Sequence, residues 1–302
     1  MKALSPRGLQ ALTGFVRRNF MATAVIDGIE IYYETCGSGP PLLMFAPGGF
    51  DSTIEKWRVA SAWTGIDALA RLGTEHQVIA YDRREAGQSG GRVERLTWTA
   101  YAREGKQLLE HLGIDSAFVM GGCMGCSVAL SFGVNYPEAT RGMILHWPVG
   151  GYRWKTASQA RFAAHLNFVR ENGMQGVVDR ASRGTTFWTD PESGPWASVI
   201  ARDSAFAGRF ADEDPERYMG IIATSGPDLF DRDTATGAAP EEVVGIKAPA
   251  VIMPGDDPSH ATSGAHYLRE CLPNGEFWNV MPPDQTTENV CERALEFTRA
   301  HR

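Results

Sequence analysis

The chain has 302 residues, 43% of them hydrophobic, so it is long enough to bury a large core. Its formal net charge of -7 argues against nucleic acid or an anionic membrane surface as a partner. No run of about 18 apolar residues occurs, so no membrane span is expected. The five cysteines are odd in number and irregularly spaced, without a secretory signal, which favours free thiols in a reducing, cytoplasmic setting.

The first twenty residues differ in character from the rest of the chain. Residues 1–20 carry four basic side chains and no acidic one, and they lack the continuous apolar region of a secretory signal. Met21, followed by Ala-Thr-Ala-Val, looks like a more natural start. We therefore expect an N-terminal extension outside the fold, with a transit peptide as the alternative.

From residue 25 onward, strand and helix patterns alternate. Residues 25–33 predict a hairpin, because two β-rich runs flank Asp27-Gly28. Strand patterns follow at residues 42–46, 76–81, 118–120, 143–147, 249–254 and 276–280, and helical patterns at 54–72, 99–112, 124–130, 263–272 and 287–299. This alternation predicts an α/β fold with a doubly wound, mostly parallel sheet.

One long stretch interrupts this alternation. Residues 150–244 show no convincing strand but several helical segments that are rich in large aromatic side chains. An insertion of this kind between two strands of one sheet predicts a helical lid. The expected organisation is a core of residues 21–149 and 245–302 with a lid of residues 150–244.

A glycine-flanked cysteine follows the strand pattern at residues 118–120. Gly121-x-Cys123-x-Gly125 has the spacing of the G-x-S-x-G nucleophile elbow, with sulfur in place of the hydroxyl. A side chain at either flanking position would collide where strand passes directly into helix. The helix N-terminus favours a thiolate at Cys123. The sequence therefore predicts Cys123 as a nucleophile; the alternative is a small buried thiol that fills the turn.

The chain resembles the α/β-hydrolase superfamily over nearly its whole length from Val25. Besides the elbow, Asp82-Arg83-Arg84-Glu85-Ala86-Gly87-Gln88-Ser89 is similar to the family's D-x-R-G-x-G-x-S, and Pro137-Glu138 after the elbow helix is typical. Pro47-Gly48-Gly49 stands where the family has His-Gly-x, so the glycine matches and the histidine does not. The resemblance implies an oxyanion hole formed by the backbone N–H groups of Met124 and Gly49.

The catalytic base is the main departure from the family. The family's histidine follows the last strand, whereas residues 280–288 contain no histidine and Asp284 stands about there. His260 lies in the loop that delivers the family's acid, so we hypothesise that base and acid have exchanged loops. Asp257, Asp284 or Asp256 would then orient His260. The alternative is that His260 only caps the following helix at the surface.

The sequence thus predicts a hydrolase that cleaves a carboxylic ester, lactone or thioester through a Cys123 acyl-enzyme. Dienelactone hydrolases are cysteine-dependent relatives on this fold, although this chain lacks their usual histidine position. The alternatives are an acyltransferase with the same chemistry, a lapsed hydrolase that binds a small ligand, and a redox protein using the C-x-x-C pair Cys123 and Cys126.

A small-molecule acyl substrate is the expected partner, and a homodimer is compatible with the sequence. Phe50, Trp147, His165 and Trp188 are expected to contact the substrate, because they lie beside the oxyanion loop, at the end of a core strand, or in the lid. No metal-ligand spacing such as H-x-x-x-H and no phosphate loop after a strand is present, so neither a metal nor a cofactor is expected.

Overall fold

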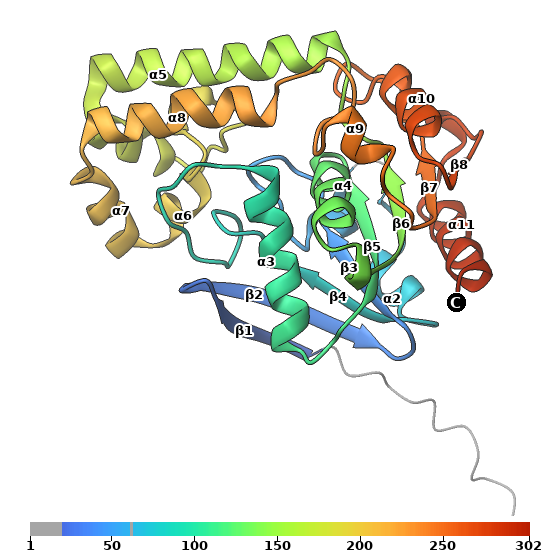
Figure 1. Cartoon of the computed structure of the whole chain (residues 1–302). Coiled ribbons are helices and arrows are strands. Elements are labelled where there is room, and N and C mark those ends of the chain that lie inside the picture. The colour runs from blue at the N-terminus through green and yellow to red at the C-terminus, as the bar shows by residue number, and fades with distance from the viewer. Residues whose placement is uncertain (1–19, 61–62) are drawn as a thin grey trace, which may run out of the picture.

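The computed structural model describes residues 20–60 and 63–302, so the expected extension of residues 1–20 lies almost entirely outside the described part (Figure 1). Within that part, eight strands form one sheet in the order β1-β2-β4-β3-β5-β6-β7-β8. The pairs β1–β2 and β2–β4 are antiparallel, and all other pairs are parallel. The prediction of a doubly wound, mostly parallel sheet is confirmed.

The strands fall close to their predicted places. They are β1 (Phe20–Ile26), β2 (Ile29–Gly37), β3 (Pro41–Phe45), β4 (Gln77–Tyr81), β5 (Ala117–Gly122), β6 (Thr140–His146), β7 (Ala250–Met253) and β8 (Gly275–Phe277). The predicted hairpin forms between β1 and β2, where Asp27 and Gly28 both have positive φ. The central strand β5 is buried along its whole length, as expected of a parallel strand covered on both faces.

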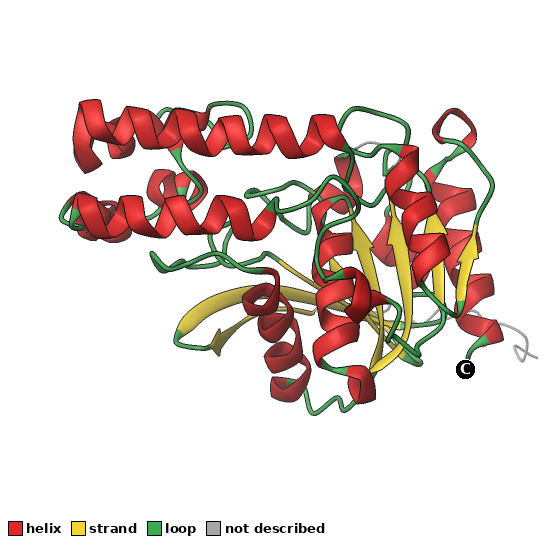
Figure 2. Cartoon of the chain, turned by 45° about the horizontal axis from the view of Figure 1, so that its top comes forward, coloured by secondary structure: helices red, strands yellow, loops and turns green. Residues whose placement is uncertain are grey.

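Helices cover both faces of the sheet (Figure 2). The core helices are α1 (Lys56–Val59), α2 (Ala68–Leu72), α3 (Trp98–His111), α4 (Met124–Asn135), α10 (Thr262–Cys271) and α11 (Thr287–Ala300). Two apolar clusters result: one contains Leu108 of α3 and Val128 of α4, and the other contains Leu69 of α2 and Leu295 of α11. All five cysteines are free thiols, as predicted.

The prediction of one helix over residues 54–72 is wrong. The chain forms the short helices α1 and α2 in place of one long helix, and residues 61–62 between them lie outside the described part. Gly65 has a φ of 104°, and Asp67 caps α2 by accepting from the backbone N–H groups of Leu69 and Ala70. The break brings Trp63 into the apolar cluster, where it is 1% exposed.

Helices fill the insertion between β6 and β7. They are α5 (Tyr152–Ala181), α6 (Ala197–Arg202), α7 (Ser204–Ala211), α8 (Pro215–Leu229) and α9 (Pro240–Val243). α5 and α8 lie side by side (Figures 1 and 2), and Gly173, with a φ of 66°, interrupts α5. Aromatic side chains pack between these helices, as where the Phe162 and Phe230 rings lie 5.7 Å apart.

The turn from β5 into α4 leaves no room for side chains beside its apex. A Cβ atom at Gly125 would lie 2.0 Å from the carbonyl oxygen of Phe45, and one at Gly121 would lie 2.4 Å from that of Gly125. Both distances are far below van der Waals contact, and both obstacles are backbone atoms. The predicted need for a glycine on each side of Cys123 is confirmed.

We predict that Gly125→Ala destabilises the protein by more than about 3 kcal/mol, because backbone of β3 or α4 must move. Gly220→Ala in α8 is the matched control: its Cβ would meet nothing within 4 Å, so it should be neutral or stabilise by about 0.5–1 kcal/mol. Urea unfolding followed by circular dichroism measures both changes. Equal midpoints for the two variants would contradict the packing argument.

Candidate active site

Cys123 occupies the apex of the turn between β5 and α4. Its backbone has φ 53° and ψ -125°, a conformation that a non-glycine residue rarely adopts, and its N–H donates to the carbonyl oxygen of His146 at 3.1 Å. The side chain is partly exposed, whereas residues 124–133 of α4 behind it are buried. The turn therefore presents the sulfur at the carboxyl end of the central strand.

The backbone N–H groups of Met124, the first residue of α4, and of Gly48, in the loop after β3, act on the Cys123 sulfur and favour its thiolate form. Gly49, the predicted second donor of the oxyanion hole, is the next residue of the same loop and lines the pocket beside Cys123. Gly48 has a φ of 116°, and a Cβ there would lie 2.5 Å from the carbonyl oxygen of Asp51, so the loop is folded too tightly for any side chain.

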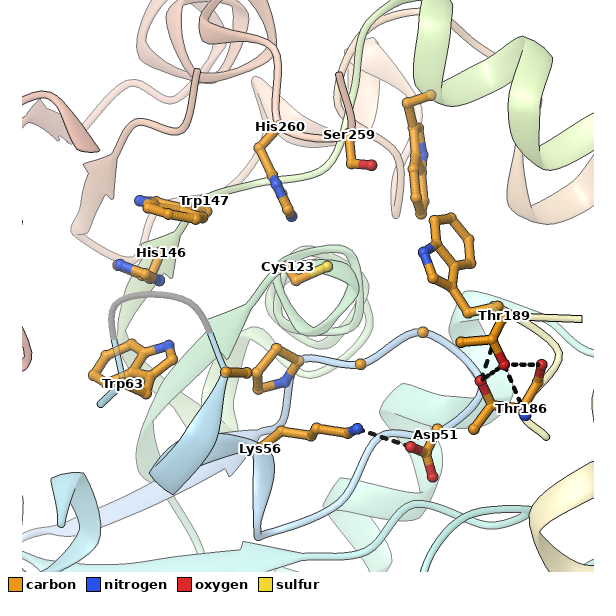
Figure 3. A pocket seen from close by; sticks show the side chains of 16 residues that line it. Asp51, Lys56, Trp63, Cys123, His146, Trp147, Thr186, Thr189, Ser259 and His260 are labelled. Atoms are coloured by element: carbon orange, nitrogen blue, oxygen red, sulfur yellow. Dashed lines mark hydrogen bonds and ion pairs between the residues drawn. The ribbon is translucent and has the colours of Figure 1, made fainter. Parts of the chain in front are cut away.

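His260 lies opposite the thiol, at the end of the loop that follows β7. Figure 3 shows its imidazole pointing toward Cys123. Nδ1 lies 2.8 Å from Oδ2 of Asp257, while Oδ1 of the same carboxylate accepts from the backbone N–H groups of Ser259 and His260. Nε2 is buried without a hydrogen bond of regular geometry. Asp257 therefore orients the ring and leaves Nε2 for the sulfur.

The charges of these groups favour a thiolate–imidazolium pair. Burial alone would raise the pKa of Cys123, but attraction to His260 and the hydrogen bonds to the sulfur outweigh it and lower the pKa. Burial alone would lower the pKa of His260, but the Cys123 charge and the bond to Asp257 raise it to about 10. The hydrogen bond to His260 lowers the pKa of Asp257 to about 2.

The structure does not bring Asp284 or Asp256 to His260. Both residues are exposed, and Asp284 lies in a short 3-10 turn after β8. Its neighbour Gln285 is the buried residue of that loop: its amide donates to the carbonyl oxygens of Pro254 and Val280 and accepts from the Trp147 indole at 2.7 Å. In the family this loop carries the histidine. Here its Gln285 connects the loop after β6 with the loop after β7.

Cys126 is embedded in the core behind the elbow. Its thiol donates to the carbonyl oxygens of Gly121 at 3.1 Å and His146 at 3.2 Å, and burial raises its pKa well above the usual value. The thiol stays protonated and has no route to solvent. This arrangement is unfavourable for the dithiol alternative, in which Cys126 would have to attack as a thiolate.

A pocket of about 350 Å³ opens beside Cys123 and His260 (Figure 3). Its walls are largely aromatic: Trp63, His146, Trp147, Trp154 and Trp188. The ion pair between Lys56 and Asp51, at 2.8 Å, and the hydroxyl groups of Thr186, Thr189 and Ser259 supply polar groups. Such a lining suits an apolar, flat group held beside the reacting atoms.

Two of the four residues expected to contact a substrate line this pocket, and two do not. Trp147 and Trp188 are in its wall. Phe50 is buried against Phe162 and Phe187, and His165 is buried in the insertion, where its Nε2 is 2.7 Å from the Tyr218 hydroxyl. These two are corrected to packing roles, because their neighbours in the insertion enclose them.

The sequence interpretation missed several wall residues. Trp63 and Lys56 were assigned to the interior of a helix that does not form, and Trp154 was one of many aromatic residues in the insertion. His146, the last residue of β6, is 1% exposed, and burial lowers its pKa to about 3, so it is neutral. A signal did exist for Trp154, since it lies only a few residues beyond the carboxyl end of β6.

Comparison with known proteins agrees with this architecture. The family profile described as alpha/beta hydrolase fold matches residues 41–173. The enol-lactonase of Burkholderia xenovorans superposes with a TM-score of 0.56 at 20% identity, covering 92% of this chain and 97% of the lactonase. The esterase RhEst1 of Rhodococcus superposes with a TM-score of 0.59 at 18% identity, covering 95% and 99%.

The chain has the α/β-hydrolase fold. The predicted resemblance is thereby confirmed. In sequence, a putative carbamate hydrolase, RutD, of Azorhizobium caulinodans is 31% identical over 116 residues, which cover 38% of this chain and 40% of RutD. The chain therefore spans about two-fifths of that relative's length, and the likeness of the solved structures concerns the fold.

Within residues 20–60 and 63–302, no group of three or more histidine, cysteine or acidic side chains is arranged to hold a metal ion. In the same part of the chain, no helix is both long and apolar enough to cross a membrane.

The electrostatics predict how Cys123 reacts with iodoacetamide. The midpoint of its pH–rate profile should lie below that of an ordinary thiol, because His260 and two backbone N–H groups stabilise the thiolate. His260→Ala should raise this midpoint by more than about one pH unit, since the imidazolium charge is lost. The rate at Cys123 is measured by peptide mass mapping.

The control variant is His266→Ala, because His266 is exposed on α10 and stacks on Phe277 away from the pocket. It should leave the midpoint unchanged. Identical profiles for His260→Ala and the unmodified protein would show that His260 does not act on the thiol.

Proposed function

We propose that this protein is a hydrolase that cleaves carboxylic esters, lactones or thioesters through an acyl-enzyme on Cys123. The observation that carries the proposal is the alignment of Cys123, His260 and Asp257 at the base of an aromatic pocket. A nucleophile, a base in contact with it and a carboxylate that orients the base are the parts that acyl transfer requires. The hydrolase names of proteins with this fold support the same class.

In the first step, the Cys123 thiolate attacks the substrate carbonyl carbon. The carbonyl oxygen becomes an oxyanion, and the N–H groups of Met124 and Gly48 are placed to stabilise it, each donor contributing roughly 2.7–4 kcal/mol in such sites. The His260 imidazolium then gives its proton to the leaving oxygen or sulfur. An alcohol or thiol departs, and a thioester on Cys123 remains.

In the second step, water releases the acyl group. The thioester carries no charge, so the pKa of His260 falls once the thiolate that raised it is gone. The neutral imidazole, held by Asp257, takes a proton from water, which attacks the thioester carbon. The carboxylic acid leaves, and the thiolate–imidazolium pair is restored.

A thiol nucleophile tolerates a base that lies on a different loop from the family's histidine. The pair is already ionised before substrate binds, so His260 need not remove a proton during the attack. Serine at this position would need that removal, and with it a precisely aligned Nε2. We therefore expect Cys123→Ser to lose most activity even though the side chain is isosteric.

The acyl-enzyme is tested with p-nitrophenyl acetate. We expect a burst of nitrophenolate of one equivalent and a mass increase of one acetyl group on Cys123 after acid quenching. Cys123→Ala should abolish both, while Cys271→Ala, which removes another partly exposed thiol, should abolish neither. Slow turnover without acylation of Cys123 would refute the proposal, and a binding protein would show neither burst nor turnover.

The aromatic wall predicts a preference for flat acyl groups. Trp188 lines the pocket, and the guanidinium of Arg161 lies 4.3 Å above its ring on the insertion side. Trp188→Ala should raise KM for p-nitrophenyl benzoate by about threefold to tenfold, since an aromatic pair contributes about 0.5–1.5 kcal/mol and 1.4 kcal/mol is a factor of ten. KM for the acetate ester should change far less.

Phe210→Ala serves as the control, because Phe210 packs on Tyr218 inside the insertion and does not reach the pocket. It should lower stability without changing the ratio of the two KM values. If Trp188→Ala leaves that ratio unchanged, the acyl group does not bind against this wall.

A further inference from the structure

Glu85 occupies a backbone conformation that normally requires glycine. Its φ is 64°, and it stands at the fourth position of D-x-R-G-x-G-x-S, where the family has glycine. Glutamate is unfavourable in this left-handed region. Its side chain is also fully buried, so the residue combines backbone strain with the burial of an acid. Backbone strain of this kind persists only where the surrounding structure holds the residue in place, and it clusters at functional sites.

The Glu85 carboxylate is the centre of a buried cluster. One of its oxygens accepts from Arg83 Nε at 3.0 Å and from the Tyr101 hydroxyl at 3.0 Å. The Arg83 guanidinium lies 4.0 Å above the Tyr101 ring, and both residues are at most 3% exposed. Because the carboxylate and the ring bind the guanidinium from two directions, Arg83 has little rotational freedom.

Arg83 connects this cluster to the loop that bears the oxyanion donor. Its Nη2 donates to the carbonyl oxygen of Gly49, and the same nitrogen lies 2.9 Å from Glu85 Oε1. Gly49 directly follows Gly48, whose backbone N–H helps to lower the pKa of Cys123. Gly48 and Gly49 both have positive φ, a conformation that other residues rarely adopt, so the direction of their N–H groups depends on contacts that keep this loop in place.

We infer that Arg83, Glu85 and Tyr101 are positioning residues that hold the Gly48–Gly49 loop in the conformation that points the Gly48 N–H at the Cys123 sulfur. Glu85 fixes the guanidinium, and the guanidinium fixes the Gly49 carbonyl. The expected effect of these residues on ester turnover rests on the proposed function. Their expected effect on the pKa of the Cys123 thiol does not. A loop released from Arg83 would withdraw one of the hydrogen bonds that stabilise the thiolate.

The charge of Glu85 itself responds to pH near neutrality. Burial is the largest influence and raises its pKa, against the opposing attraction of Arg83, to about 7. The titratable and charged groups that act on it are Arg83, Arg84, Tyr81, Tyr101 and Glu104. Above that pH the carboxylate is ionised and holds Arg83 most strongly, so loop order should increase as pH rises through 7.

The test compares Glu85→Gly with Glu85→Gln. The first restores the family's glycine and removes the acid, and the second keeps the side-chain shape without the charge. We expect Glu85→Gly to raise the midpoint of the Cys123 alkylation profile and to lower kcat for p-nitrophenyl acetate by about tenfold to a hundredfold, with KM changed less than about twofold. Glu85→Gln should raise the midpoint and lower kcat by smaller amounts than Glu85→Gly does.

Glu94→Gln is the control. Glu94 is an acid that binds Arg84, whose other side-chain partners are Glu104 and Asp27, and it is not one of the charged groups that act on Glu85. This variant should leave the alkylation midpoint and kcat unchanged, whatever its melting temperature. An unshifted midpoint and unchanged kcat in a folded Glu85→Gly would overturn the inference.

The alkylation profile keeps this test separate from the proposed function. If the unmodified protein turned over no ester, the proposed function would fail, yet a shifted Cys123 midpoint in Glu85→Gly would still support the positioning role. If esters are turned over but Glu85→Gly behaves as the unmodified protein, only the inference fails.

Discussion

The architecture of the site depends on one steric constraint, the absence of space between the start of α4 and the end of β3. The carbonyl oxygen of Phe45 lies so close to Gly125 that no side chain fits, and this contact joins the elbow to the strand that leads into the Gly48–Gly49 loop. The same contact therefore fixes both the position of the Cys123 sulfur and the start of the loop whose N–H faces it. The positions of the proposed nucleophile and oxyanion donor are thus set by backbone packing.

The proposed base and the acid that orients it come from one short stretch of the chain. Asp257 and His260 are three residues apart in one loop, and the carboxylate binds both the ring and the backbone N–H groups of Ser259 and His260. The loop thus folds the acid and the base as one unit, and a parallel bridge between Gly150 and His260 attaches it to the chain entering the insertion. The loop after β8 carries no histidine, and its Gln285 joins the Trp147 indole to the carbonyl oxygen of Pro254.

Patterns with a strict local cause could be predicted from the sequence. The strand–helix alternation, the Asp27-Gly28 hairpin and the glycine requirement around Cys123 depend on neighbours in the chain, and all are found in the structure. Features that depend on how distant loops meet could not be predicted. Asp257 and Asp284 were equally plausible partners of His260, because their distance is set by the packing of β7 against β8. Whether the N–H of Gly48 or that of Gly49 acts on the Cys123 sulfur depends on the backbone dihedral angles of single residues.

Backbone strain is concentrated around the pocket. In the described part of the chain, four non-glycine residues have positive φ: Asp27 in the hairpin turn, and Glu85, Cys123 and Trp147. The last three each cost about 1–3 kcal/mol, and each serves one side of the same site. Cys123 presents the sulfur, and Trp147 forms a wall 5.6 Å from the His260 ring while its indole binds Gln285. Glu85 would be the third member of this set, because its carboxylate binds Arg83, and Arg83 in turn binds the Gly49 carbonyl. Glycine would relieve the backbone strain at this position but would leave the Arg83 guanidinium without its carboxylate partner, which connects the strain to the order of the Gly48–Gly49 loop.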